Sequence, residues 1–128
     1  MSFTYEFHHM GIPVKEQKPG ERYSEKFKMY TTDSISENYR IQFHRFEDGC
    51  LLHDLIQTMP HIAYKVSSLD EAIKNENIIM EPYEPFSGFK VAMIEKSGVP
   101  IEFIETTLSE NEIWDTKKHK NSIIYTNK

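Results

Sequence analysis

Cysteine is almost absent from this sequence. The 128 residues include a single cysteine, Cys50, so no disulfide bond can form within the chain. Cys50 follows Gly49 in a segment typical of a turn, and no second cysteine completes a redox or zinc-binding motif. We therefore interpret Cys50 as a structural residue rather than as a catalytic nucleophile.

The chain also lacks a long hydrophobic run and an excess of basic residues. No stretch reaches the roughly 20 apolar residues that cross a bilayer, and no basic and then apolar leader opens the sequence. The 15 Lys and Arg are outnumbered by 20 Asp and Glu, which gives a net charge of -5. Phosphate binding needs concentrated positive charge, so this balance argues against nucleic acid. We expect a cytoplasmic protein that binds a small molecule, with neither nucleic acid nor membrane as a partner.

The remaining composition is that of an ordinary folded domain. Hydrophobic residues make up 38% of the chain, aromatic residues 12% and charged residues 27%, which excludes the disordered and fibrous classes. The length suits one hydrophobic core rather than two. We treat residues 1–128 as a single domain.

Strands dominate the expected secondary structure. Segments rich in β-branched and aromatic residues alternate with Gly, Pro, Asp, Asn and Ser, and this pattern predicts strands at Tyr5–Val14, Phe27–Thr32, Tyr39–Phe46, His61–Val66, Phe89–Glu95 and Pro100–Thr106.

Capping patterns predict two short helices. Ser68 followed by Glu71 has the spacing of a capping box and opens a helix over Ser68–Lys74. Ser109 and Glu112 repeat this spacing, which predicts a turn or two of helix that docks Ile113 and Trp114 on the body.

Three other segments have weaker signals. Pro19 and Gly20 interrupt helix formation, so only a helix remnant is expected over Glu21–Phe27. Residues 81–90 contain two prolines and a glycine, typical of a turn-rich loop that either borders a cleft through Tyr83 or Phe86 or is a simple connector. The tail from residue 116 either frays or covers a neighbouring subunit.

The sequence contains a weak internal repeat. HMGIPV from His9 aligns with HIAYKV from His61, matching at the histidine, a small third residue and the final valine. Further along in each copy, RIQFHRF aligns with PIEFIET, which pairs Gln42 with Glu102. Two matched strands in the same order suggest a duplicated unit.

Alternation along strands predicts how the repeated polar residues are presented. His9 and His61 each share a face with a small residue two positions on, while Gln42 and Glu102 project opposite their apolar neighbours. If the copies pack about a pseudo-two-fold axis, these four side chains converge on one cleft. Two imidazoles, an amide oxygen and a carboxylate form a ligand set for zinc, nickel, cobalt, manganese or iron. The alternative is that each histidine is a hydrogen-bonded structural residue.

Three segments resemble the vicinal-oxygen-chelate superfamily, in the order found there: HHMGIPV, PHIAYKVSSLDEAI and GVPIEFIE. That superfamily includes lactoylglutathione lyase, methylmalonyl-CoA epimerase, extradiol dioxygenases, fosfomycin-modifying enzymes and metal-free bleomycin-binding proteins. The resemblance implies an α+β fold in which two βαβββ modules form a curved mixed sheet around a cleft. Module one would cover residues 1–58 with a shortened helix and module two residues 59–107, leaving a tail over 108–128.

By the same resemblance, His9, Gln42, His61 and Glu102 match the metal ligands. A histidine, glutamine, histidine and glutamate set is most similar to that of methylmalonyl-CoA epimerase. Glu102 would supply the carboxylate of the catalytic site. No separate acid or base of the family matches a position here, and His44 is the best local candidate, because it follows Gln42 by two residues on the same face, roughly 7 Å away. Its alternative is a structural role.

The other histidines carry no chemical signal. His8 is expected to point away from His9 and to serve packing or face solvent, since neighbours in a strand alternate faces. His53 and His119 fall in loop and tail contexts.

Two functions follow as hypotheses. The first is a divalent-metal-dependent isomerase, epimerase or lyase that stabilises an enediolate on a small oxygenated substrate. The alternative is a metal-free protein that binds a drug or metabolite in the same cleft. Iron-dependent oxygen chemistry is less favoured because of Gln42. The resemblance also implies a homodimer.

Overall fold

A computed structural model describes residues 4–36 and 38–115 of the chain. Its strands are β1 (Tyr5–Val14), β2 (Arg22–Ser24), β3 (Met29–Ile35), β4 (Arg40–Phe46), β5 (His61–Val66), β6 (Asn77–Phe86), β7 (Phe89–Lys96) and β8 (Val99–Thr106). Three short helices accompany them: α1 (Asp54–Thr58), α2 (Leu69–Ile73) and α3 (Glu110–Ile113). The predicted tail from residue 116, with His119, lies outside the described residues.

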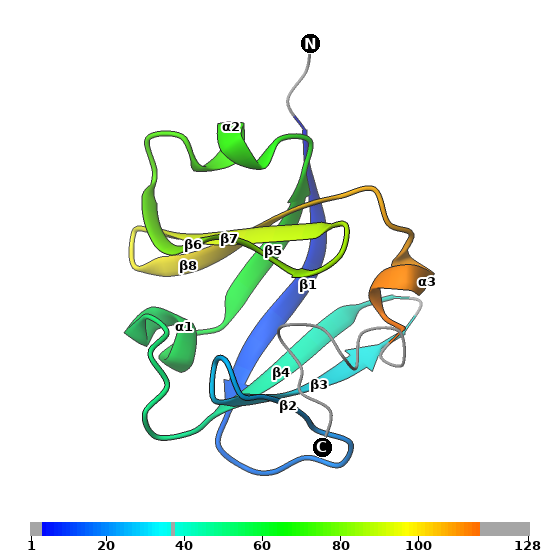
Figure 1. Cartoon of the computed structure of the whole chain (residues 1–128), viewed down its shortest axis with the longest axis vertical. Helices are drawn as coiled ribbons and strands as arrows, with labels where there is room; N and C mark the ends of the chain where they lie inside the picture. Colours follow the sequence, from blue (N-terminus) through cyan, green and yellow to red (C-terminus); the bar gives the residue numbers. More distant parts are fainter. Residues whose placement is uncertain (1–3, 37, 116–128) are drawn as a thin grey trace.

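All eight strands form one sheet in the order β2-β3-β4-β1-β5-β8-β7-β6. The two halves of the chain meet where β1 and β5 pair antiparallel, and each half adds its last strand in parallel beside its first, β4 on β1 and β8 on β5. The sheet is curved, as Figure 1 shows. The predicted α+β fold, with two modules forming a curved mixed sheet, is confirmed.

The strand registers place the repeated residues at equivalent positions. Gly11 lies opposite Gln42 across β1 and β4, and Ala63 lies opposite Glu102 across β5 and β8. Between the halves, Gly11 also lies opposite His61. The four predicted ligands therefore come from the two central strands and their parallel neighbours.

The two halves differ in the connection after their first strand. In the second half, α2 begins after Ser68, whose hydroxyl accepts a hydrogen bond from the Glu71 backbone at 3.3 Å, as predicted. In the first half, the expected helix remnant over Glu21–Phe27 is instead strand β2 and the start of a turn. Pro19 removes a backbone donor and Gly20 adopts a φ of +77°, so the chain there cannot continue as a helix.

Two elements lack a recognisable sequence signal. Strand β6 covers most of the segment expected to be a loop, because Pro82 and Pro85 are tolerated at the edge of a sheet. Its pairing with β7 shifts register three times, as expected where prolines cannot donate. Helix α1 has only five residues and begins after His53, whose ring accepts from the Leu55 backbone at 3.1 Å.

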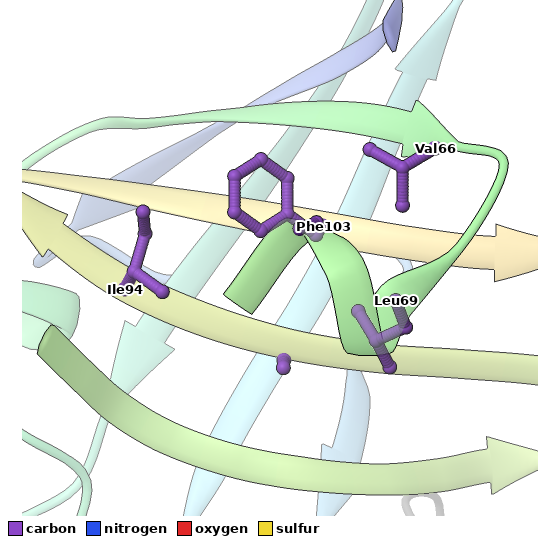
Figure 2. Packing of buried hydrophobic residues seen from close by; sticks show 6 residues of the cluster. Val66, Leu69, Ile94 and Phe103 are labelled. Atoms are coloured by element: carbon purple, nitrogen blue, oxygen red, sulfur yellow. The ribbon is translucent and has the colours of Figure 1, made fainter. Parts of the chain in front are cut away.

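The main hydrophobic core lies between α2 and the sheet (Figure 2). Its buried members are Val66, Leu69, Ala72, Ala92, Ile94 and Phe103. Full burial of a side chain such as Leu69 contributes about 1.5–3 kcal/mol. All six residues belong to the second half, so this half contains the better-packed core.

A second core cluster occupies the opposite, inner face of the sheet. Ala63, Phe89, Val91 and Ile104 meet there with Ile113, which α3 contributes. The capping box that predicted α3 is present, since the Ser109 and Glu112 side chains bond each other's backbone amides. Within the described residues, no helix has the length and apolar character needed to span a bilayer.

Candidate metal centre and adjoining cavity

His9, His61 and Glu102 meet on the inner face of the sheet. The Nε2 atom of each histidine lies 3.3 Å from Glu102 Oε1, and one ligand atom from each residue lies within 4.8 Å of the others. Both histidines are buried, and Glu102 is half-buried with 15% of its side chain exposed. The structure thus brings together three of the four predicted ligands.

Small residues in the centre of the sheet make room for the imidazoles. A Cβ atom added at Gly11 would overlap the His61 ring. On the other side of the pairing, His9 lies opposite Ala63, which is fully buried. The absence of a side chain at Gly11, two positions after His9, is therefore a steric requirement of His61 in the other half.

The carboxylate of Glu102 is charged at neutral pH. Burial acts to raise its pKa, but the approach of the His61 and His9 rings to 3.3 Å outweighs burial and holds the pKa well below its usual range. An ionised carboxylate and two ring nitrogens are ligands suited to a divalent transition metal.

One atom of the cluster is poorly satisfied by the protein alone. His9 Nε2 is buried and, despite its 3.3 Å approach to Glu102 Oε1, makes no well-directed hydrogen bond. Buried polar atoms without partners are rare in folded proteins. A cation bound between the imidazoles and the carboxylate would satisfy this nitrogen, so the residues present fit a metal ion.

Gln42 lines the same cavity, but its amide is oriented by another residue. Its Nε2 donates to Asp33 Oδ1 at 3.0 Å, and Asp33 in turn pairs with Arg22 at 3.0 Å. The carbonyl oxygen is therefore the end of Gln42 that remains for a ligand role. Asp33 and Arg22 were not predicted, because nothing in the sequence distinguishes them from solvent-exposed charged residues.

His44 lies against His61, with ring centres 5.9 Å apart and planes 18° from parallel. One ring nitrogen shares a hydrogen bond of 3.0 Å with the Thr31 hydroxyl. Burial, followed by the charge of His61, lowers the pKa of His44 to about 3. The ring is neutral near pH 7 and is a weak base there. Its contact with His61 fits a residue that orients that ring, and its place in the lining of the cavity fits proton transfer.

The expected direction of His8 was wrong. Strand β1 carries a bulge between Phe7 and His9, which pair with the consecutive residues Tyr64 and Ala63 of β5. The extra residue is His8, and its Nδ1 lies 2.9 Å from His9 Nδ1. Burial and the charge of His9 lower the pKa of His8 to about 4. Simple alternation cannot foresee this contact, because a bulge breaks the period of two.

His9, His61, Glu102, Gln42 and His44 form a polar end of the cavity. The rest of its lining includes an apolar wall. This wall includes Met29, Met80, Met93, Tyr83, Phe86 and Phe89. The Phe86 and Phe89 rings stack with centres 4.6 Å apart, and Trp114 of the α3 region also lines the space. The prediction that Tyr83 or Phe86 borders a cleft is confirmed for both residues.

Comparisons with known proteins identify the fold. No family model and no curated protein matches this sequence. Among solved structures, a hypothetical protein from Bacillus halodurans C-125 aligns with a TM-score of 0.64 and 19% identity, over 83% of this chain and 97% of that one. Methylmalonyl-CoA epimerase from Mycobacterium tuberculosis aligns with a TM-score of 0.58 and 15% identity, over 80% of this chain and 89% of that one. The chain therefore has a glyoxalase-like fold.

Proposed function

We propose that this chain is a divalent-metal-dependent isomerase, epimerase or lyase that acts on a small oxygenated substrate through an enediolate. The observation that supports this most directly is the convergence of His9, His61 and Glu102 within 4.8 Å at the end of a cavity. In this proposal Gln42 is the fourth ligand, and zinc, nickel, cobalt, manganese and iron all suit the set. The likeness to methylmalonyl-CoA epimerase supports the reaction class by analogy of fold.

A bound divalent ion would stabilise negative charge that develops on two adjacent substrate oxygens. The protein's own residues prepare the site for this. Asp33 accepts from the Gln42 amide and so turns the carbonyl oxygen towards the ligand role. His44 packs on His61 and is itself held by the buried hydroxyl of Thr31, which fixes the plane of the ligand ring.

The cavity limits the class of substrate. The polar end accepts an oxygenated head, and the wall of methionine and aromatic side chains accepts an apolar group. Arg22 lines the cavity, but its charge is balanced by two contacts with Asp33, at 3.1 Å and 3.0 Å. A substrate with one oxygenated and one apolar part fits this division better than one with several anionic groups.

Elemental analysis of protein purified without chelators tests the metal. We expect close to one divalent ion per chain in the parent, and loss of the ion from His61→Ala and Glu102→Gln. Gln57→Ala, in α1 outside the lining of the cavity, is the control and should retain the metal. Parent protein that takes up none of the five metals, even after they are added, contradicts the proposal.

The metal-free binding protein is the second candidate. It is favoured by the apolar wall and by the 3.3 Å approach of His9 Nε2 and His61 Nε2 to Glu102 Oε1, because a protonated imidazole would pair with this carboxylate without a cation. A thermal-shift series separates the two candidates. Stabilisation by an amphipathic aromatic compound, together with no shift from any divalent ion, would favour the binding protein.

A further inference from the structure

Two histidines are adjacent in β1, His8 and His9. His9 is a candidate metal ligand through Nε2, and His8 contacts the other nitrogen of that ring, Nδ1. His8 is 1% exposed, and its Nδ1 lies 2.9 Å from His9 Nδ1. At this distance one proton lies between the nitrogens, since two protons would clash and two lone pairs would repel. Either ring can therefore be the donor, and what His8 contacts on its far side decides which.

The far side of His8 faces a carboxylate from α3. His8 Nε2 lies 3.0 Å from Glu110 Oε1, a close contact although the two groups are not aligned as a straight hydrogen bond. The same oxygen accepts from Trp114 Nε1 at 3.0 Å, and the indole stacks on the His8 ring with planes 9° apart. Arg40 donates to the His8 carbonyl at 2.6 Å and lies 3.7 Å from Glu110 Oε1. Glu110 is thus fixed from three sides.

With a divalent ion bound to His9 Nε2, these contacts select one arrangement of protons, because the ion takes the lone pair of that nitrogen and leaves the ring proton on Nδ1. A carboxylate only accepts, so His8 carries its proton on Nε2, beside Glu110. A neutral His8 then has a lone pair on Nδ1, which accepts the Nδ1–H of His9. His9 in that tautomer has a bare Nε2, which is the atom that faces Glu102 and His61.

We propose that Glu110 and His8 form a relay that holds His9 in the Nδ1–H tautomer, so that Nε2 is presented to the divalent ion. Both are positioning residues, since neither reaches the ion itself. The inference rests on the proposed metal site and extends it to helix α3, which lies more than 100 residues from His9 in the sequence. An outer carboxylate that orients a metal-bound histidine commonly affects metal affinity by about 10–100-fold.

The second half of the molecule serves as an internal reference. The repeat places Pro60 before His61 where His8 stands before His9. Proline has no side-chain donor or acceptor, so the relay belongs to the first half alone. We therefore expect changes at His8 and Glu110 to alter the environment of His9 and to leave that of His61 unchanged.

Zinc affinity, measured by competition with a chelating dye, tests the relay. His8→Phe retains the stacking on Trp114 but removes both nitrogens, and Glu110→Ala removes the carboxylate; each should weaken zinc binding about 10–100-fold. His8→Asn places an amide oxygen near the original Nδ1 and should recover most of the affinity. Glu112→Ala is the control, because it removes the α3 capping box without removing the His8 contact, and should bind zinc as the parent does.

The tautomers are read directly from ¹⁵N chemical shifts of the histidine rings in the zinc-loaded protein. We expect His9 protonated on Nδ1 and His8 on Nε2 in the parent, with the His8 assignment lost or averaged in Glu110→Ala. Unchanged zinc affinity and unchanged ring shifts in Glu110→Ala and His8→Phe would overturn the relay while leaving the metal site in place. An equal loss in Glu112→Ala would also overturn it, since α3 would then act only by docking. A parent that binds none of zinc, nickel, cobalt, manganese and iron would instead overturn the proposed function, and the relay with it.

Discussion

The two halves of this molecule share a strand register and differ in what covers the outer face of the sheet. In the second half, two buried residues of α2 pack against four buried residues of β5, β7 and β8. In the first half, the segment between β1 and β2 has no helix and makes contacts through charged side chains. Arg45 of β4 forms two bonds of 2.7 and 2.8 Å with Glu21, and Lys18 lies 4.4 Å from the centre of the Phe43 ring.

Because of this difference, the second half contributes more to stability and the first half contributes more of the polar residues that are specific to the site. Apolar burial in the second half contributes several kcal/mol, whereas partly exposed ion pairs and cation–π contacts contribute about 1 kcal/mol or less each. The first half in turn supplies the polar residues without counterparts in the repeat, such as His8 and Asp33. In a duplicated unit, one copy can stabilise the fold while the other acquires the side chains that a particular site needs. The following predictions test this division, beginning with the largest effect.

Removing a side chain from the α2 core should have the largest effect. Leu69 is 3% exposed, so Leu69→Ala leaves a cavity and should lower the free energy of unfolding by about 2–5 kcal/mol. Urea denaturation followed by circular dichroism measures this. Leu52→Ala, in the smaller cluster around Met29, is the matched change in the first half and should cost less. Equal losses would contradict the division between the halves.

The second largest effect is expected from substitutions at Gly11 and Ala63, the small residues that lie opposite the two histidines. Gly11→Ala forces the His61 ring to move and should lower the free energy of unfolding by about 1–3 kcal/mol and disrupt divalent-ion binding. Ala63→Gly, at the equivalent position, only removes a methyl group and should leave ion binding intact. Isothermal titration with zinc compares the variants. Parent-like zinc affinity in Gly11→Ala would show that the ring does not need this space.

Acid should lower the free energy of unfolding through two buried histidines of the first half, His44 and His8. The pKa values of His44 and His8 lie near 3 and 4, below the ordinary 6.5, so the unfolded chain binds more protons than the folded one as the pH falls below about 6.5. Between pH 6 and 5 each histidine should lower the free energy of unfolding by about 1.4 kcal/mol per pH unit. The depressed pKa of Glu102 adds stability that is lost only below its ordinary value of 4.5.

Urea denaturation at a series of pH values tests this for metal-free protein. In His44→Gln, the free energy of unfolding should change less steeply between pH 6.5 and 5, because one of the two histidines no longer takes up a proton. An identical slope in the parent and the variant would assign the pH dependence to other groups.

The smallest effect is expected at the charged covering of the first half. Arg45→Gln removes the paired bonds to Glu21 and the contact with the Tyr30 ring, and should lower the free energy of unfolding by about 1 kcal/mol. High salt should reduce the difference between parent and variant, since the lost interaction is electrostatic. A loss as large as that of Leu69→Ala would show that the loop stabilises the sheet as strongly as a helix does.

The sequence was most informative where the period of two is unbroken. His61, Glu102 and their apolar neighbours could be assigned to faces because β5 and β8 are regular, and the repeat linked them to His9 and Gln42. His8 was misassigned because the bulge in β1 has no signature in composition. Strand β6 was missed because proline marks both loops and edge strands. Asp33 and Glu110 could not be found at all, since their roles depend on contacts between distant segments.

The two ends of the sheet have a consequence for how copies of the chain meet. One end is β2, with three residues, and the other is β6, which contains Pro82 and Pro85 and pairs irregularly with its neighbour. Neither end offers a long row of free backbone amides and carbonyls, so neither is a good template for an added strand. The sheet therefore resists growth by addition of a strand at either edge.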